Sequence, residues 1–245
     1  MKYYDCHFHL PNATPEGFAS LISNLKDEGS DFVGGNLVLN SQPEIDLVYS
    51  NIGLIPKSVT LVPLLDKSLD VQPEISKAGW YKIHPALQKI SKEKIPSFIN
   101  FISTNSKSVK GLILHYFPWG KDIQYCTSLE ILIALVNRFP KIPVMVSHGG
   151  GYDSWVVRAH TTSFKNIYYD FSVTLKYFKD TCYLKPLQVY LEKFPERVLF
   201  GSDWPWGERS EQLKTLAELA AALNIPEDKV EKLILDNALR LWKKE

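Results

Sequence analysis

Short runs of β-branched and aromatic residues alternate with longer amphipathic segments along almost the whole chain. Apolar residues recur at helical spacing in the longer segments, as in Phe18, Leu21 and Leu25. The short runs have the length and composition of buried strands. Eight of them are found, at 3–9, 32–39, 59–65, 80–84, 112–115, 144–148, 167–171 and 198–201. The pattern therefore predicts parallel strands that are separated by helices.

Local signals place the first helix and the last two. Thr14 supplies a capping side chain, Pro15 suits the first helical position, and Gly29 follows the last apolar position. After the eighth strand, two further helices are predicted over 211–223 and 226–242. Three segments have weak or no periodicity, and we expect irregular connections there: 43–54, 67–77 and 172–185.

Eight strands that are each followed by a helix are typical of a closed (β/α)8 barrel, the TIM barrel. A doubly wound open sheet usually has fewer strands and a phosphate-binding loop near its start. We therefore expect an α/β protein with a single barrel domain over residues 1–245 and extra C-terminal helices. A domain of this kind commonly has about 250 residues.

Composition narrows the class of protein. Hydrophobic residues make up 45% of the chain and charged residues 22%, which indicates a folded globular protein. The formal charge of +1 supplies no basic stripe for nucleic acid, so none is expected as a partner. No leader or membrane span is expected, because the apolar runs are too short. The three cysteines form no C-x-x-C pair, which favours reduced thiols in the cytoplasm.

Polar side chains that can bind metals follow several predicted strands. Alternate residues of a strand share a face, so Asp5, His7 and His9 are expected to point the same way. His115 and His148 end the predicted strands five and six, and Asp203 follows the eighth. The carboxyl ends of barrel strands meet at one face, and imidazole nitrogens suit Zn2+. These positions predict a metal site at the mouth of the barrel.

Each of these residues also has a purely structural interpretation. A lone His-x-His is common by chance. Here, however, five of the six histidines end predicted strands. Burying these five imidazole rings without a shared ion would leave hydrogen-bond donors unpaired. His160 lies in a helical segment and is given no role. Cys6 has the opposite parity to the ligands and is expected to pack outward against helices. The glycines 149–151 fit a turn and a close backbone approach to a ligand equally well.

An ordered set of motifs resembles the amidohydrolase superfamily, and its amidohydrolase 2 branch most closely. The motifs are Asp-Cys-His-Phe-His at 5–9, Lys-Ile-His-Pro at 82–85, Ser-His-Gly-Gly at 147–150, Phe-Gly-Ser-Asp-Trp-Pro at 200–205 and Asn-Ala-Leu-Arg-Leu at 237–241. The resemblance implies one divalent ion, Zn2+ before Mn2+ or others, held by His7, His9, His115 and Asp203. It also implies that His148 holds or polarises the metal-bound water, with Asp203 sharing the proton transfers.

The resemblance implies a metal-dependent hydrolase whose activated water attacks an amide, a lactone or a related carbonyl. Two alternatives stay open: a non-oxidative decarboxylase of a carboxylated aromatic or unsaturated substrate, and a non-catalytic metal- or ligand-binding barrel. The candidate base argues against the last of these, since passive binding needs no base. The expected partner is a small-molecule substrate, and a homo-oligomer is possible.

Four residues are expected to contact the substrate: Lys82, His84, Trp119 and Trp204. Some superfamily members hold two metals that are bridged by a carboxylated lysine, and Lys82 stands near that place. We expect one metal and interpret Lys82 as a cation for a substrate carboxylate or as a residue that closes the barrel.

Overall fold

The computed structural model describes residues 1–65, 79–118, 125 and 127–242. Within them, every predicted strand is present and begins within one residue of its predicted start. The strands are β1 (Tyr3–His9), β2 (Phe32–Leu39), β3 (Val59–Pro63), β4 (Trp80–Ile83), β5 (Gly111–Leu114), β6 (Val144–Val146), β7 (Ile167–Asp170) and β8 (Val198–Leu199). All neighbouring strands that pair along their length are parallel.

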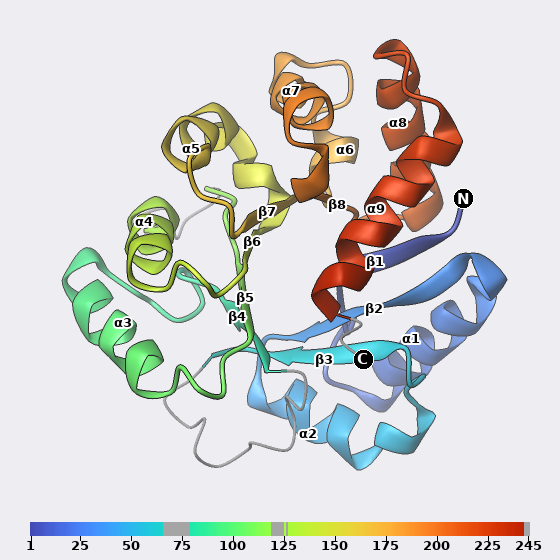
Figure 1. Cartoon of the computed structure of the whole chain (residues 1–245). Coiled ribbons are helices and arrows are strands. Elements are labelled where there is room, and N and C mark those ends of the chain that lie inside the picture. The colour runs from blue at the N-terminus through green and yellow to red at the C-terminus, as the bar shows by residue number, and fades with distance from the viewer. Residues whose placement is uncertain (66–78, 119–124, 126, 243–245) are drawn as a thin grey trace.

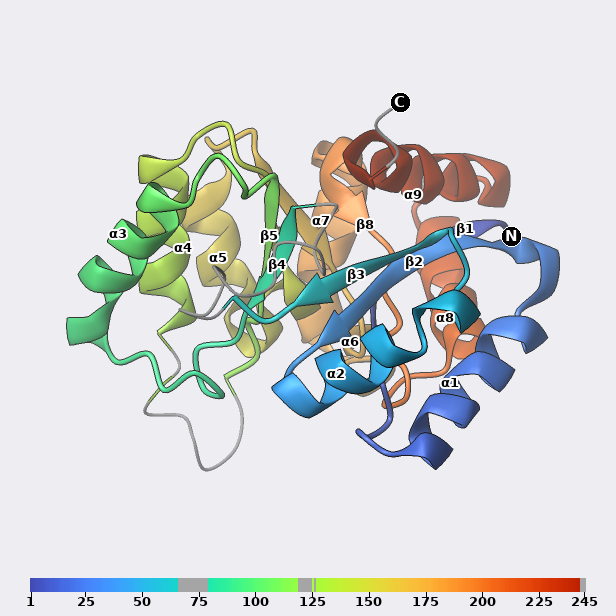
Figure 2. The same cartoon turned by 90° about the horizontal axis from the view of Figure 1, so that it is seen from below.

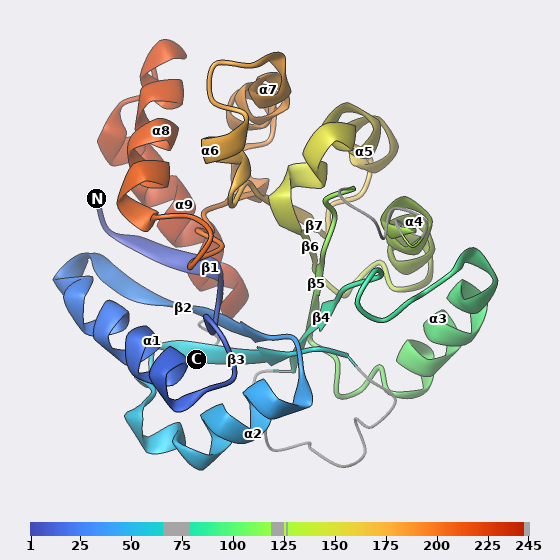
Figure 3. The same ribbon diagram turned by 180° about the vertical axis from the view of Figure 1, so that it is seen from behind.

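The strands form two sheets, β1–β3 and β4–β8, that are joined at both edges. At one edge the backbone N–H of Leu65 donates to the carbonyl of Lys82 at 2.7 Å. At the other edge Cys6 N–H donates to the carbonyl of Phe200 at 2.8 Å, and His9 N–H donates to that of Trp204 at 2.8 Å. These bonds close the barrel, and the helices form a ring around it (Figures 1 and 3), as predicted.

The described helices are α1 (Pro15–Asp27), α2 (Gln42–Ser50), α3 (Ile95–Thr104), α4 (Ser128–Arg138), α5 (Ser154–Thr161), α6 (Thr174–Tyr177), α7 (Lys185–Lys193), α8 (Arg209–Ala222) and α9 (Glu227–Trp242). The start of α1 is confirmed, because Thr14 Oγ1 accepts from Gly17 N–H at 3.2 Å. The two C-terminal helices are confirmed as α8 and α9. None of the described helices is both long and apolar enough to cross a bilayer.

The irregular connection expected over 43–54 is wrong for most of that segment, which forms α2. The reason is a reciprocal cap that the weak periodicity concealed. Ser41 Oγ accepts from Glu44 N–H at 3.4 Å, and Glu44 Oε2 accepts from Asn40 N–H at 2.7 Å, so the first turn is held from both sides. Segment 172–185 contains the short α6, and 67–77 lies outside the described residues.

Apolar side chains fill both the inside of the barrel and the layer beneath the helices. The interior cluster takes residues from nearly every strand and from α9: Tyr4, Cys6, Val38, Val62, Trp80, Ile113, Met145, Leu199 and Ala238. Helix α9 lies across the barrel end at which the strands begin (Figures 1 and 2). The opposite end is left for the polar residues that follow the strands.

A register irregularity in β1 between Asp5 and Phe8 changes which side chains face the interior. Cys6, which was predicted to pack outward, is fully buried in the interior cluster. Asp5, which was predicted to share a face with His7, instead pairs with Arg209 of the outer helix α8. A bulge breaks the strict alternation of a strand, and both predictions depended on that alternation.

Candidate functional site

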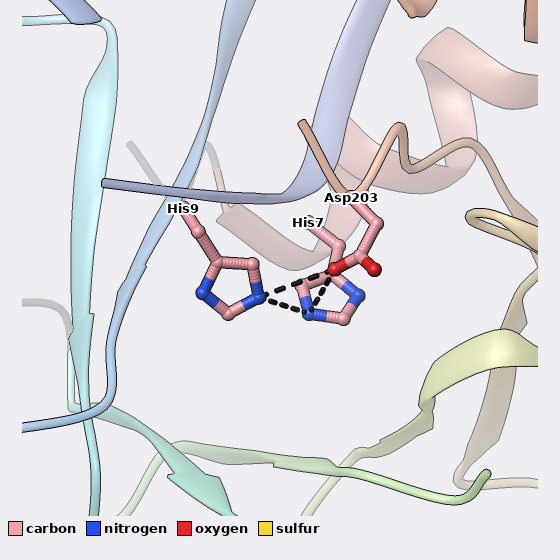
Figure 4. A group of neighbouring side chains, drawn as sticks. All are labelled: His7, His9 and Asp203. Atoms are coloured by element: carbon pink, nitrogen blue, oxygen red, sulfur yellow. Dashed lines mark hydrogen bonds and ion pairs between the residues drawn. The ribbon is translucent and has the colours of Figure 1, made fainter. Parts of the chain in front are cut away.

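Three of the predicted metal ligands converge at the barrel mouth. His7 and His9 come from the end of β1, and Asp203 follows β8 (Figure 4). His7 Nε2 lies 3.1 Å from His9 Nε2, and Asp203 Oδ1 lies 3.5 Å from the former and 3.2 Å from the latter. His7 and His9 are buried and the Asp203 side chain is 13% exposed. Among the described residues, this is the group of potential ligands close enough to share one ion.

The ring of His7 is fixed in one tautomer by the end of β7. Its Nδ1 lies 3.0 Å from Asp170 Oδ2 and 3.1 Å from Ser172 Oγ. A carboxylate only accepts, so Nδ1 carries the proton and Nε2 keeps its lone pair for an ion. Burial lowers the pKa of His7 well below its ordinary value, and the nearby Lys82 lowers it further. The neutral ring is the form that binds metals.

The side chain of Asn40, just after β2, sets the orientation of His9. Asn40 Nδ2 lies 3.2 Å from His9 Nδ1, while Asn40 Oδ1 is buried without a partner among the described residues. Amide oxygen and nitrogen are assigned from their hydrogen bonds, and rotating this amide would let Oδ1 accept a proton from His9 Nδ1. That arrangement satisfies the orphaned oxygen and leaves the lone pair of His9 Nε2 directed at His7 and Asp203.

His148 is held in the tautomer that a base requires. Its Nδ1 donates to the backbone carbonyl of Ser172 at 3.1 Å, so Nε2 is the unprotonated nitrogen. That nitrogen lies 3.3 Å from His115 Nδ1. The His148 ring lies beside the His7 ring, with a centroid separation of 5.2 Å. Burial lowers the pKa of His148, which keeps the ring able to accept a proton.

Burial and neighbouring charges oppose one another at Asp203. Burial by itself would raise the pKa of this carboxyl, but the adjacent His7 and His9 side chains lower it below its ordinary value. The residue is therefore an anion that can bind a cation. Its backbone has φ of +58°, and His148 has φ of +60°. Such strained conformations in non-glycine residues often occur at functional sites.

Lys82 in β4 and His84, which directly follows β4, lie in the same region. Lys82 Nζ lies 2.9 Å from His7 Nε2 and donates to Ser147 Oγ at 3.0 Å. Burial lowers the pKa of Lys82 to about 8. The His84 ring stacks on the His115 ring at 3.8 Å, and burial lowers the pKa of His84 to about 3. Both of these residues, which were predicted to contact the substrate, thus lie near the other histidines.

The structure places His115 beside His148 and His84 rather than in the three-residue group. Its role as the fourth ligand stays a prediction. Trp204 is 7% exposed and lies in the apolar layer under α1 and α2, where its ring covers Arg209. Trp206 packs its ring edge-on against His9 instead, at 5.1 Å. Trp119 lies outside the described residues.

The glycines that follow His148 form a tight turn. Gly149 has φ of +57°, and a Cβ atom at this position would overlap the ring of Phe171. The turn interpretation is therefore confirmed, with close side-chain packing as the added reason for glycine. The approach of a ligand to this backbone stays a prediction.

Sequence reasoning missed the residues that orient the histidines. Asp170 is the last residue of β7 and Asn40 follows β2, so the strand-end rule applied to His115 and Asp203 would have selected both. Arg209 lies in a helix, and no local signal marks it. Phe117, which packs edge-on against His148 at 5.5 Å, is one of many aromatic residues in the loops.

The chain matches the family model described as amidohydrolase over residues 55–244. An uncharacterised TIM-barrel protein from Bordetella bronchiseptica superposes with a TM-score of 0.70 at 15% identity, over 98% of both chains. Dihydroorotase from Campylobacter jejuni superposes with a TM-score of 0.63 at 17% identity, over 100% of this chain and 84% of the dihydroorotase chain. A TatD-family hydrolase from Entamoeba histolytica superposes with a TM-score of 0.52 at 8% identity, over 99% of this chain and 98% of the hydrolase chain. At these identities the similarity shows the barrel fold. No curated protein matches the chain.

Proposed function

Because the chain belongs to the amidohydrolase family, we propose that it is a metal-dependent hydrolase acting on an amide, a lactone or a related carbonyl. His7, His9 and Asp203 would hold one divalent ion, with Zn2+ as the first candidate. The observation that carries this proposal is the spacing of their three ligand atoms.

The spacing fits tetrahedral coordination. Ligand atoms that each lie about 2.0–2.1 Å from one tetrahedral ion are about 3.3–3.4 Å from one another. The three separations here are 3.1, 3.2 and 3.5 Å. In addition, Asp170 directs the lone pair of His7 toward the shared position, and the rotated amide of Asn40 does the same for His9. The donor set of two imidazoles and one carboxylate is common for catalytic zinc.

His115 is proposed as a fourth ligand. Its Nδ1 lies 3.3 Å from His148 Nε2, and its ring stacks on that of His84. Burial lowers the pKa of His115 well below its ordinary value, and the neutral ring is the ligating form.

When bound, the ion would acidify a water molecule and polarise the substrate carbonyl. The protein then has to move one proton from the water to the leaving group. His148 Nε2 is the proposed acceptor, because its Nδ1 proton is fixed on the Ser172 carbonyl. The Ser172 backbone also stabilises the ring once it becomes protonated. The Asp203 carboxylate, adjacent to both His7 and His9, is the proposed second site for that proton.

Two aromatic rings suggest the shape of the substrate. Trp206 packs against His9 and is 51% exposed, and Phe117 packs against His148. These rings border the site at two different histidines, which suits a substrate with a flat or apolar group. Trp119 and Trp204 remain predicted substrate contacts.

Decarboxylation is the second candidate, and Lys82 favours it. Its ammonium group lies 2.9 Å from the ligand atom of His7, where it could pair with a substrate carboxylate. A hydrolase that acts on an acidic substrate could use the same contact.

Metal analysis of the purified chain, followed by a screen of lactones, amides and aromatic carboxylates, tests the proposal. We expect about one divalent ion per chain and acid release from a lactone or an amide. His7→Ala should lose metal and turnover together, whereas His160→Ala, an exposed change in α5, should keep both. Release of CO2 would identify a decarboxylase. A firmly bound metal without turnover would favour the non-catalytic barrel, and a chain that binds no divalent metal contradicts the proposal.

We also propose a cytoplasmic location. Cys6 and Cys182 are free thiols in the described part of the chain, which suits a reducing compartment. A small molecule is the expected substrate. The exclusion of nucleic acid and the possible homo-oligomer stay predictions.

A further inference from the structure

A second cavity opens at the barrel end opposite the proposed reaction site. Its volume is about 460 Å3, within the range of small-molecule pockets. Its lining includes Trp80, the first residue of β4, Lys110, which precedes β5, and Trp242, the last residue of α9. The strands begin at this end, whereas His7 and Asp203 lie at the end where they finish. The cavity is therefore separate from the histidine cluster.

Four cationic side chains line this cavity: Lys110, Lys141, Lys165 and Arg240. No Asp or Glu is among its described lining residues, and none of the four cations forms an ion pair with another described residue. The whole chain has a formal charge of only +1, so this is a local concentration of positive charge. Like charges around one concave surface attract and hold an anion.

Parts of the cavity wall are held in place by hydrogen bonds. One terminal nitrogen of Arg240 donates to the carbonyl of Glu196 at 2.6 Å and to Asn237 Oδ1 at 3.0 Å. Asn166 Nδ2 donates to the carbonyls of both ends of segment 139–142, at 3.2 and 2.7 Å. That segment carries Lys141. Binding a ligand would thus require little ordering of the backbone, which favours affinity.

Aromatic rings form another part of the wall. Trp80 and Trp242 lie with ring centroids 4.5 Å apart, and Tyr168 also lines the cavity. Trp242 and Tyr168 are partly exposed, so part of each ring is open to a ligand.

We propose that this cavity binds a small organic anion that combines a flat ring with a phosphate group, the chemistry of a nucleotide. The lysines and Arg240 would pair with the phosphate, and the partly exposed rings of Trp242 and Tyr168 would contact the flat ring. A ligand with both parts would contact the cations and the partly exposed rings together, whereas a simple anion or a neutral ring would use only one of these features. The site is independent of the proposed hydrolase activity.

Calorimetric titration of the full metal-loaded chain with AMP, adenosine and inorganic phosphate tests this proposal. We expect AMP to bind more tightly than either fragment, and its affinity to fall as salt increases. Lys141→Glu with Lys165→Glu should weaken AMP binding at least about tenfold, or ~1.4 kcal/mol. Lys26→Glu with Lys214→Glu makes the same charge change at exposed positions in α1 and α8, and should leave AMP affinity within about twofold.

His7→Ala separates the two ends of the barrel, since it alters the metal site and should leave AMP affinity unchanged. Loss of AMP binding in that variant would place the nucleotide at the metal site and overturn the proposal. Equal weakening by the two double variants, equal affinity for phosphate and AMP, or no binding of AMP at millimolar concentration would each overturn it as well. None of these results depends on whether the chain hydrolyses a carbonyl substrate.

Discussion

The carboxylate of Asp5 accepts a hydrogen bond of 2.6 Å from Arg209 Nε, on the side of β1 that faces the helices. Both side chains are almost fully buried. Asp5 also accepts from the backbone N–H and the hydroxyl of Ser202, at 2.9 and 2.6 Å. One carboxylate thus ties β1, which carries His7 and His9, to the residue that precedes Asp203. The ion pair holds together the two segments that supply the proposed ligands.

Arg209→Met should destabilise the protein by about 3–5 kcal/mol, because it leaves the Asp5 charge buried without its partner. Urea unfolding of the metal-free chain measures this loss. The double variant Asp5→Asn with Arg209→Met removes both charges and should lose less than the sum of the two single variants. A loss below about 1 kcal/mol for Arg209→Met would show that the pair contributes little.

The eight strands could be predicted from sequence because each is a short apolar run, and burial inside a barrel requires that pattern. The direction in which each side chain of β1 points could not be predicted in this way. Strict alternation placed Asp5 with His7 and Cys6 on the outside, whereas the register irregularity after Asp5 reverses both. A bulge depends on how β1 pairs with β2, and no local residue pattern marks it.

The strand-end histidines and Asp203 were predictable for a similar reason, since barrel geometry gathers the carboxyl ends of all strands. The residues that form hydrogen bonds with these side chains were harder to predict from the sequence. Asp170 and His7 are 163 positions apart, and their contact depends on two strand registers at once. The reciprocal cap of α2 is a local signal that weak hydrophobic periodicity concealed, so that helix could have been found from Ser41 and Glu44.

Asp170→Asn should weaken metal binding by about 10–100-fold, because it removes the charged acceptor that fixes the His7 tautomer. Competition with a chromogenic chelator measures the affinity. Asp46→Asn, a change on the exposed side of α2, provides a control that should keep the wild-type value. Thermal unfolding of the metal-free variant shows whether the fold is retained. Unchanged metal affinity in a folded Asp170→Asn protein would show that the hydrogen bond between Asp170 and His7 Nδ1 does not contribute to metal binding.

Stability should fall as pH rises above about 10, in part because of Tyr4. Burial raises the pKa of Tyr4 well above its ordinary value, and its hydroxyl donates to Asn36 Oδ1 at 2.9 Å. The unfolded chain releases this proton near pH 10 while the folded chain keeps it, so the free energy of unfolding decreases with rising pH. The slope from one such group is about 1.4 kcal/mol per pH unit.

Urea unfolding at a series of alkaline pH values tests this dependence. Tyr4→Phe removes the ionisable group, so its stability should decline less steeply above about pH 10 than that of the wild type. Tyr177→Phe alters a side chain that is 61% exposed and should leave the slope unchanged. Parallel curves for Tyr4→Phe and the wild type would mean that Tyr4 ionises as readily in the folded chain as in the unfolded one.

His148→Gln should separate metal binding from turnover. Because His148 faces His115 and Ser172 rather than the three-residue ligand group, we expect the variant to keep its metal. Loss of the proton acceptor should lower kcat by about 10²–10⁴-fold on the substrate found in the screen. His160→Gln in α5 is the matched histidine control and should match the wild type in metal content and rate. Loss of metal in His148→Gln would make this residue a ligand, and an unchanged rate would end its assignment as the base.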